Sequence, residues 1–315
     1  MRMKHFVLRA GYGVFLLCAA AQAAQRPVEA PPVVPAAAPA YDDDPRSMGG
    51  GRCRDNVYNC ADTPNPLPAA KTVWIDEMTW MDVRDALAAG KKTVIIPSGG
   101  IEPNGVWTAL GKHDWIAHGL CESVARRLGN ALCAPVVEFV PEGEPGQKHS
   151  HADTVGTIGV SDATYAAVVS DIARGMKAHG FENIILVGDH GGGQQIMADV
   201  ADRLNKEWGG THAIYIKAFY DSWDGADALL QKDMKLWQPG VKDGMHDDPD
   251  VELQLIVQDP ETIRWRERVK AHKAVINGVS VADLSQARAW GRRIVEYRTT
   301  VTVAAINQAI VARSH

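Results

Sequence analysis

Apolar runs and amphipathic stretches alternate along the chain after about residue 71. The apolar runs are short and rich in β-branched residues, which is typical of strands buried on both faces of a sheet. They predict four strands, at 92–97, 134–141, 183–188 and 212–220. Because such strands alternate with helical patterns, we expect a mostly parallel sheet covered by helices on both faces, a three-layer α/β/α fold.

Helices are predicted where apolar residues recur every three or four positions. Thr79 is placed to begin one that ends at Gly90, and Ser161 one that ends at Gly180. Threonine and serine favour the N-cap of a helix, whereas glycine is favoured just beyond its C-terminus. The same spacing recurs in three further stretches, at 116–128, 196–204 and 285–313.

The first residues of the chain differ from this pattern. Residues 1–24 combine a basic start, a short apolar stretch and small residues, which predicts a secretory signal peptide cleaved near Ala23 or Ala24. A lipoprotein signal at Cys18 is the alternative, but Leu17 stands where such a signal needs a small residue. We therefore expect a periplasmic or secreted protein.

Residues 25–70 are rich in proline, alanine and glycine, which predicts a disordered lead-in to a folded domain at 71–315. Removal of the signal peptide takes away three positive charges and changes the net charge from −5 to −8. An acidic protein is a poor candidate for binding nucleic acid or anionic lipid. We therefore expect no nucleic-acid partner and, after signal cleavage, no membrane association.

The cysteines outside the signal peptide are even in number, which suits disulfides in an exported chain. Cys53 and Cys60 are expected to close a small loop in the lead-in. For Cys121 and Cys133, a disulfide and two buried thiols both remain open.

Polar side chains follow two of the predicted strands. The first strand is followed by Glu102, Asn104, His113 and Asp114, and the third by Asp189 and His190. Ligands of parallel sheets bind at the carboxyl ends of the strands, so these side chains are expected at one edge. Glutamate and histidine together suit zinc, manganese or iron. The alternative to a metal site is that Glu102 is a solvated loop carboxylate and His190 a turn residue hydrogen-bonded to the backbone.

Three glycines follow His190 in the segment HGGG. Glycines let the backbone approach a ligand closely and can present N–H groups to an anion. The same letters resemble the oxyanion turn of lipase-like hydrolases, but the chain has no G-x-S-x-G segment for a serine nucleophile. A serine esterase is therefore the weakest of the hypotheses about function.

Four segments, taken in order, resemble the creatininase, or creatinine amidohydrolase, family. They are PSGGIEPNGVWTALGKH at 97–113, TVGTIGVSDATY at 154–165, GDHGGG at 188–193 and HDDPDVELQL at 246–255. The resemblance extends over roughly residues 74–310. It implies the three-layer fold and a metal-dependent amidohydrolase, in which metal-activated water cleaves a non-peptide or cyclic amide bond of a small molecule.

The resemblance also implies roles for individual residues. The implied metal ligands are Glu102, His113 and His190, with Asp114 replacing His113 if the alignment shifts by one residue. Glu252 and His246 are the implied catalytic residues, Glu252 as proton carrier and His246 in contact with substrate. The alternative for Glu252 is an ion pair with a basic residue at the start of a helix. The expected substrate-binding residues are Asn104, Trp107, His151, Gly191 and Gly192.

Two departures from the family pattern change the expected metal content. Asn104 stands where the family has a histidine ligand, and Gly192 stands where creatininase itself has a glutamate ligand. We therefore expect one divalent metal ion, zinc in the first place and manganese or iron as alternatives. Loss of all metal would leave a catalytically silent binding protein, which is the second hypothesis about function after the amidohydrolase. Because family members form rings, the resemblance implies a homo-oligomer, with a hexamer as one form.

Overall fold

The computed structural model describes residues 64–65, 67–236 and 246–313. The predicted signal peptide and the expected Cys53–Cys60 loop lie outside these residues. Within the described ranges, no helix is both long and apolar enough to cross a membrane.

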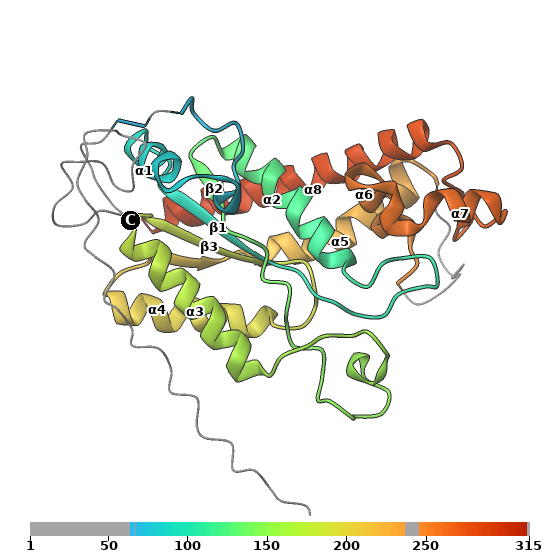
Figure 1. The fold of residues 1–315 in the computed structure, drawn as a ribbon, viewed down its shortest axis with the longest axis horizontal. Helices are drawn as coiled ribbons and strands as arrows, with labels where there is room; N and C mark the ends of the chain where they lie inside the picture. The colour runs from blue at the N-terminus through green and yellow to red at the C-terminus, as the bar shows by residue number, and fades with distance from the viewer. Residues whose placement is uncertain (1–63, 66, 237–245, 314–315) are drawn as a thin grey trace, which may run out of the picture. The chain divides into compact units, whose positions relative to one another are not determined.

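A parallel sheet forms the centre of the domain (Figure 1). Its strands are β1 (Thr93–Ser98), β2 (Ala131–Cys133), β3 (Asn183–Gly188) and β4 (Ala213–Tyr215), in the order β2-β1-β3-β4. β1 pairs with β3 along its whole length, from Thr93 beside Asn183 to Ser98 beside Gly188. The loops that follow these two strands therefore leave the sheet side by side.

Alternate side chains of β1 face opposite layers of helices. Val94 and Ile96 pack in a core that includes α3 (Asp162–Ala178) and α4 (Gln194–Trp208). Ile95 packs in a second core that includes α2 (Lys112–Leu128) and α8 (Leu284–Ala312). The three-layer α/β/α prediction is confirmed, because each face of the sheet is covered by helices (Figure 1).

The other elements surround these layers. The helices are α1 (Trp80–Ala88), α5 (Ala218–Ala228), a π-helix (Leu229–Asp233), α6 (Pro249–Gln258) and α7 (Trp265–Lys270). Short 3₁₀ turns occupy Ile75–Glu77, His151–Asp153 and Pro260–Ile263, and β5 (Val275–Ile276) pairs with β6 (Val279–Ser280) in an antiparallel hairpin. Residues of α5, α6 and α8 share a third core.

The predicted helix signals are borne out at several ends. The Thr79 side chain accepts a hydrogen bond from the Asp82 N–H and caps α1, and Ser161 caps α3 through the Thr164 N–H. The predicted C-terminal helix forms as α8.

The second strand was predicted too late in the chain. It forms at Ala131–Cys133, and in the predicted stretch 134–141 only Val137 makes a β-bridge, to Ser98. Pro135 and Pro141 lie in that stretch, and proline lacks the N–H that a central strand must donate.

The fourth strand was predicted too long. It ends at Tyr215, and the chain enters α5 at Ala218. A short apolar run alone does not separate a strand from a buried helix, so the pattern merged the two.

Cys121 of α2 and Cys133 of β2 form a disulfide, which decides between the two open alternatives for this pair. Both residues are fully buried in the core between the sheet and the α2–α8 layer. The bond ties the helix to the edge strand that follows it.

We predict that the double variant Cys121→Ala, Cys133→Ala loses about 3 kcal/mol of unfolding free energy, the stabilisation expected for a bridge closing a loop of this size. Urea denaturation with and without reductant checks this. Reductant should shift the transition of the unmodified protein and leave that of the double variant in place. A transition of the unmodified protein that ignores reductant contradicts the prediction.

Candidate metal centre

Four side chains gather beyond the carboxyl ends of β1 and β3. Glu102, Glu142, His151 and His190 each offer one ligand atom, and these four atoms lie within 4.8 Å of one another. Three of the residues are buried, and the His151 side chain is 38% exposed. Two carboxylates and two imidazoles form a donor set suited to zinc and similar divalent ions.

The carboxylate of Glu102 is the hub of the cluster. Its Oε2 lies 3.0 Å from His190 Nε2 and 2.5 Å from His151 Nδ1. Its Oε1 lies 2.9 Å from His113 Nε2 and contacts Lys112 Nζ. Burial alone raises the pKa of Glu102, but hydrogen bonds from His113 and His190 and the charge of Lys112 outweigh burial and bring it far below its usual value.

Glu142 completes the cluster from the loop after β2. Its Oε2 lies 3.2 Å from His190 Nε2 and 3.3 Å from His151 Nδ1. Its Oε1 is buried and has no hydrogen-bond partner among the described residues. Leaving a buried carboxylate oxygen without a partner is costly, and a bound cation removes that cost. The residues present therefore fit a divalent ion.

The HGGG turn orients His190. The Gly192 N–H donates to His190 Nδ1 over 2.9 Å, which leaves Nε2 directed at the carboxylates. Because the Gly192 N–H is engaged by the ring, it is not free to bind an anion, as the glycine pattern had suggested.

His113 bridges two buried carboxylates. Its Nδ1 lies 2.7 Å from Asp189 Oδ2, and its Nε2 faces Glu102. Arg298 donates to Asp189 Oδ1 over 2.8 Å. Burial raises the pKa of Asp189, but the Arg298 charge and the His113 hydrogen bond lower it more. A carboxylate on one ring nitrogen fixes the tautomer that presents the other nitrogen, as in outer-shell partners of metal ligands.

Asp114, the alternative to His113, has a different environment. Its Oδ1 accepts a hydrogen bond from the Gly100 N–H over 2.9 Å. Burial raises the pKa of the Asp114 carboxyl to about 7. Of the two residues proposed for this position, His113 is the one that contacts Glu102.

The two implied catalytic residues lie in different places. His246 Nδ1 lies 3.2 Å from Glu102 Oε1 and 3.1 Å from the Pro103 carbonyl oxygen, at the candidate centre. Glu252 is fully buried, and its two oxygens accept hydrogen bonds of 2.6 and 2.8 Å from Arg268. Thr108 donates a third over 2.7 Å. The structure thus places Glu252 in an ion pair with a basic residue, the alternative that the sequence left open.

The expected substrate-binding residues also separate into two groups. His151, Gly191 and Gly192 line a cavity of about 390 Å³ at the cluster. Asn104 and Trp107 line a neighbouring cavity of about 690 Å³, beside Arg268. The structure therefore does not bring Trp107 to the histidines and carboxylates, and Trp223 lines their cavity instead.

The cavity at the cluster is also lined by aspartates and aromatic residues. They are residues of α5 and of the start of α6: Tyr220, Asp221, Trp223, Asp224, Asp227, Asp248 and Asp250. Burial raises the pKa of Asp227 to about 6 and that of Asp250 well above its usual value. The volume suits a small molecule.

Comparison with known proteins adds independent support for the fold and the family. The family model for creatininase, described as creatinine amidohydrolase, matches residues 76–302, which is most of the chain. The chain belongs to the creatininase family.

A curated member of the family, the creatinine amidohydrolase of Pseudomonas putida, is 28% identical over 123 residues. The match covers 38% of this chain and 46% of that enzyme, so the chain spans about half the length of the curated relative it matches. A crystal structure of creatininase is 19% identical, with a TM-score of 0.59, covering 76% of this chain and 98% of that chain. A mutant creatininase described as the Zn-Zn type is 19% identical with a TM-score of 0.59, and the match covers 76% of this chain and 99% of that chain. A creatininase with Mn is 21% identical with a TM-score of 0.54, and the match covers 76% of this chain and 98% of that chain. These structural likenesses establish the fold.

This creatininase-family chain has no room for a side chain at Gly192. A Cβ added there would lie 2.2 Å from the Pro141 carbonyl oxygen, and Gly193 has a left-handed φ of 84°. The glycines after His190 therefore serve the packing of the turn, and a glutamate ligand at 192 would require the turn to move.

Two residues of the centre were not assigned from the sequence. Glu142 follows the stretch predicted as the second strand, so an acidic residue at the end of a predicted parallel strand was the available signal. Lys112 lies in the first creatininase-like segment, at 97–113, but lysine is a residue type that does not bind metal. Its burial is visible only in the structure.

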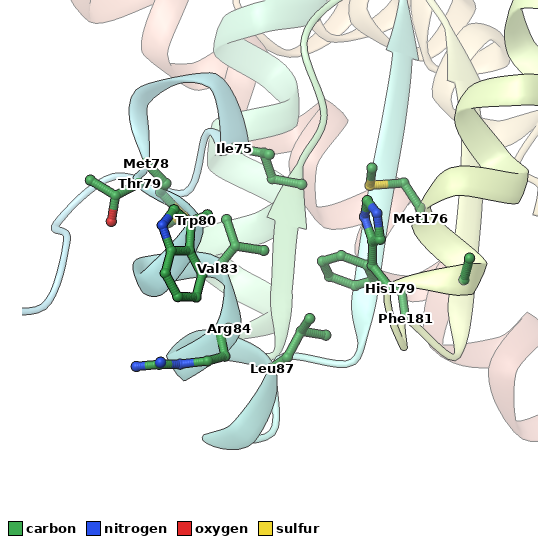
Figure 2. A pocket seen from close by; sticks show the side chains of 11 residues that line it. Ile75, Met78, Thr79, Trp80, Val83, Arg84, Leu87, Met176, His179 and Phe181 are labelled. Atoms are coloured by element: carbon green, nitrogen blue, oxygen red, sulfur yellow. The ribbon is translucent and has the colours of Figure 1, made fainter. Parts of the chain in front are cut away.

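The structure also contains an apolar cleft of about 750 Å³, away from these groups (Figure 2). Trp80, Val83 and Leu87 of α1 form one side, and Met176 and Phe181 the other. Leu87 and Phe181 precede β1 and β3, so the cleft lies at the opposite end of these strands from the cluster. It contains none of the cluster residues, so the candidate functional site is the smaller, polar cavity.

The raised pKa of Asp114 predicts a pH effect on stability. Because its folded pKa of about 7 exceeds the unfolded value of 3.8, the free energy of unfolding falls as pH rises from about 4 to 7. Asp114→Asn keeps the acceptor for the Gly100 N–H and removes this loss. Between pH 4 and 8, we expect the free energy of unfolding of the variant to rise relative to that of the unmodified protein by on the order of 2–4 kcal/mol.

Urea denaturation of both metal-free proteins across this pH range measures the difference. Using the difference between variant and unmodified protein cancels the titration of all other groups. A difference that does not change with pH shows that Asp114 ionises normally in the folded protein.

Proposed function

We propose that this protein is a metal-dependent amidohydrolase that cleaves a non-peptide or cyclic amide bond of a small molecule. The observation that carries the proposal is the cluster of Glu102, Glu142, His151 and His190, with a buried Glu142 oxygen that lacks a partner among the described residues. Family membership supports the reaction class, and the zinc and manganese creatininases support the metal class. We propose one divalent ion, with zinc first.

A divalent ion held by these four residues would supply water of lowered pKa and polarise the substrate carbonyl. Proton transfer to the leaving nitrogen is assigned to His246, which lies at the cavity beside Glu102. Burial and the nearby Lys112 charge lower the pKa of His246, which favours the neutral imidazole that can take a proton from the attacking water and then pass it to the leaving nitrogen. Glu252 is committed to Arg268, which is why we move the proton-carrying role away from it.

The lining of the cavity favours neutral or cationic substrates. Asp221 and Asp224 of α5 line the same cavity, and their carboxylates would repel an anionic group. Trp223 adds an aromatic surface, with the Arg298 guanidinium 4.0 Å from its ring centroid. A small planar amide, of the kind a cyclic substrate presents, fits this combination.

The alternative of a catalytically silent binding protein has one observation in its favour. Glu252, the proton carrier implied by the family resemblance, is buried in an ion pair with Arg268. If no other group carries protons, the fold and the metal would persist without turnover. Binding and catalysis must therefore be measured separately.

Metal analysis of variants tests the proposed ligands. The unmodified protein, purified without chelator, is expected to hold about one zinc, manganese or iron ion per chain. Glu142→Gln should weaken metal binding by more than the ~10–100-fold that outer-shell substitutions cost. Glu144→Gln changes an exposed carboxylate two residues away and is the matched control, expected to retain the metal.

Elemental analysis after dialysis, followed by a screen of small cyclic amides for amine or ammonia release, measures both properties. Metal retention by Glu142→Gln would remove Glu142 from the ligand set. Metal binding without release from any amide would favour the silent binding protein.

Export to the periplasm or medium and assembly into a homo-oligomer also belong to this proposal. The Cys121–Cys133 disulfide supports an oxidising compartment, where such bonds persist.

A further inference from the structure

The carboxylate of Glu102 has two sides with different neighbours. Its Oε2 faces the imidazoles of His151 and His190, which belong to the candidate metal cluster. Its Oε1 faces His113 Nε2 at 2.9 Å and His246 Nδ1 at 3.2 Å. Each side therefore combines a carboxylate oxygen with two imidazole nitrogens, donor types that bind divalent ions, and on the Oε2 side one atom of each residue, with one of Glu142, already lies within 4.8 Å of the others.

Lys112 occupies the second of these sides. Its ammonium contacts Glu102 Oε1 and lies 2.5 Å from Asn104 Oδ1. The side chain is 2% exposed, so the ammonium is held among these groups and out of solvent. A buried ammonium requires such partners, because an isolated one is strongly disfavoured.

The position of Lys112 in its helix is otherwise unfavourable. It is the first residue of α2, where the unpaired N–H groups of the helix create a positive potential. No benefit from the helix therefore explains a buried cation there, whereas the contacts with Glu102 and Asn104 do. Asn104 is fixed in turn, since its amide donates to the backbone oxygens of Glu102 and Ala109 over 3.1 and 2.7 Å.

We propose that the ammonium of Lys112 is a built-in cation that takes the place of a second metal ion and restricts this centre to one. The inference rests on the proposed function, which supplies the first ion. An ion on the Oε1 side would meet the positive charge of Lys112 and would find that oxygen engaged. The neutral Asn104 suits an ammonium partner and adds no charge to attract a second ion. Lys112 is thus a positioning residue that sets metal stoichiometry.

Titration of zinc into chelator-treated protein, followed by calorimetry, tests the inference. The unmodified protein is expected to bind one zinc per chain, and Lys112→Ala two, because Glu102 Oε1, which lies between His113 Nε2 and His246 Nδ1, loses the ammonium that occupies it. Lys112→Arg retains the charge and should bind one. Lys71→Ala removes an exposed lysine outside the centre and is the matched control, also expected to bind one.

A further variant ties the second ion to its place. His113→Ala in the Lys112→Ala background should return the stoichiometry to one. A variant that merely folds poorly would bind less zinc, so a gain of an ion is not produced by general destabilisation. Electron paramagnetic resonance with manganese adds a second readout: the unmodified protein should give the spectrum of an isolated ion, and Lys112→Ala that of a coupled pair.

The outcomes separate this inference from the proposed function. One zinc in both the unmodified protein and Lys112→Ala would overturn the role of Lys112 and leave the single-metal hydrolase intact. Two zinc ions in the unmodified protein would also overturn it. No zinc in the unmodified protein would contradict the proposed function and this inference together.

Discussion

Buried carboxylates at one edge of the sheet need positive charge close to them, and the centre is organised around that need. Glu102, Glu142 and Asp189 are all buried beyond β1, β2 and β3. Arg298 neutralises Asp189, and Lys112 contacts one oxygen of Glu102. Among the described residues, Glu142 contacts imidazoles through one carboxylate oxygen, and its other oxygen has no hydrogen-bond partner. A cation bound in the cluster would neutralise this remaining negative charge.

The fold supplies this arrangement through strand register. β1 and β3 run parallel and in step, so Glu102 and His190 leave the sheet beside each other. The first turn of α2 returns Lys112 and His113 to the same carboxylate. From the same layer as α2, α8 contributes Arg298, which lies more than a hundred residues later in the chain and donates to Asp189. The centre therefore requires the sheet and the α2–α8 layer to be assembled together.

The features of the fold and the site that could be predicted from the sequence are those encoded by local pattern. Buried strands, their order and the polar residues after them predicted the α/β/α fold and the pairing of Glu102 with His190. The pattern misplaced the second strand, because it weighed apolar residues at 134–141 above the prolines among them. The family resemblance implied a catalytic role for Glu252 and left an ion pair open; the pair forms because Arg268 of α7 reaches Glu252 of α6, a contact that no local spacing reveals. The same reason hid Glu142 and Lys112, whose roles arise from burial.

The zinc-edge X-ray absorption spectrum of the zinc-loaded protein tests the central claim most directly, because it reports the atoms bound to the ion. We predict that nitrogen and oxygen atoms surround the zinc ion at about 2.0–2.2 Å, with additional scattering from two imidazole rings. A shell that contains sulfur, or one without imidazole scattering, would contradict a centre formed by Glu102, Glu142, His151 and His190.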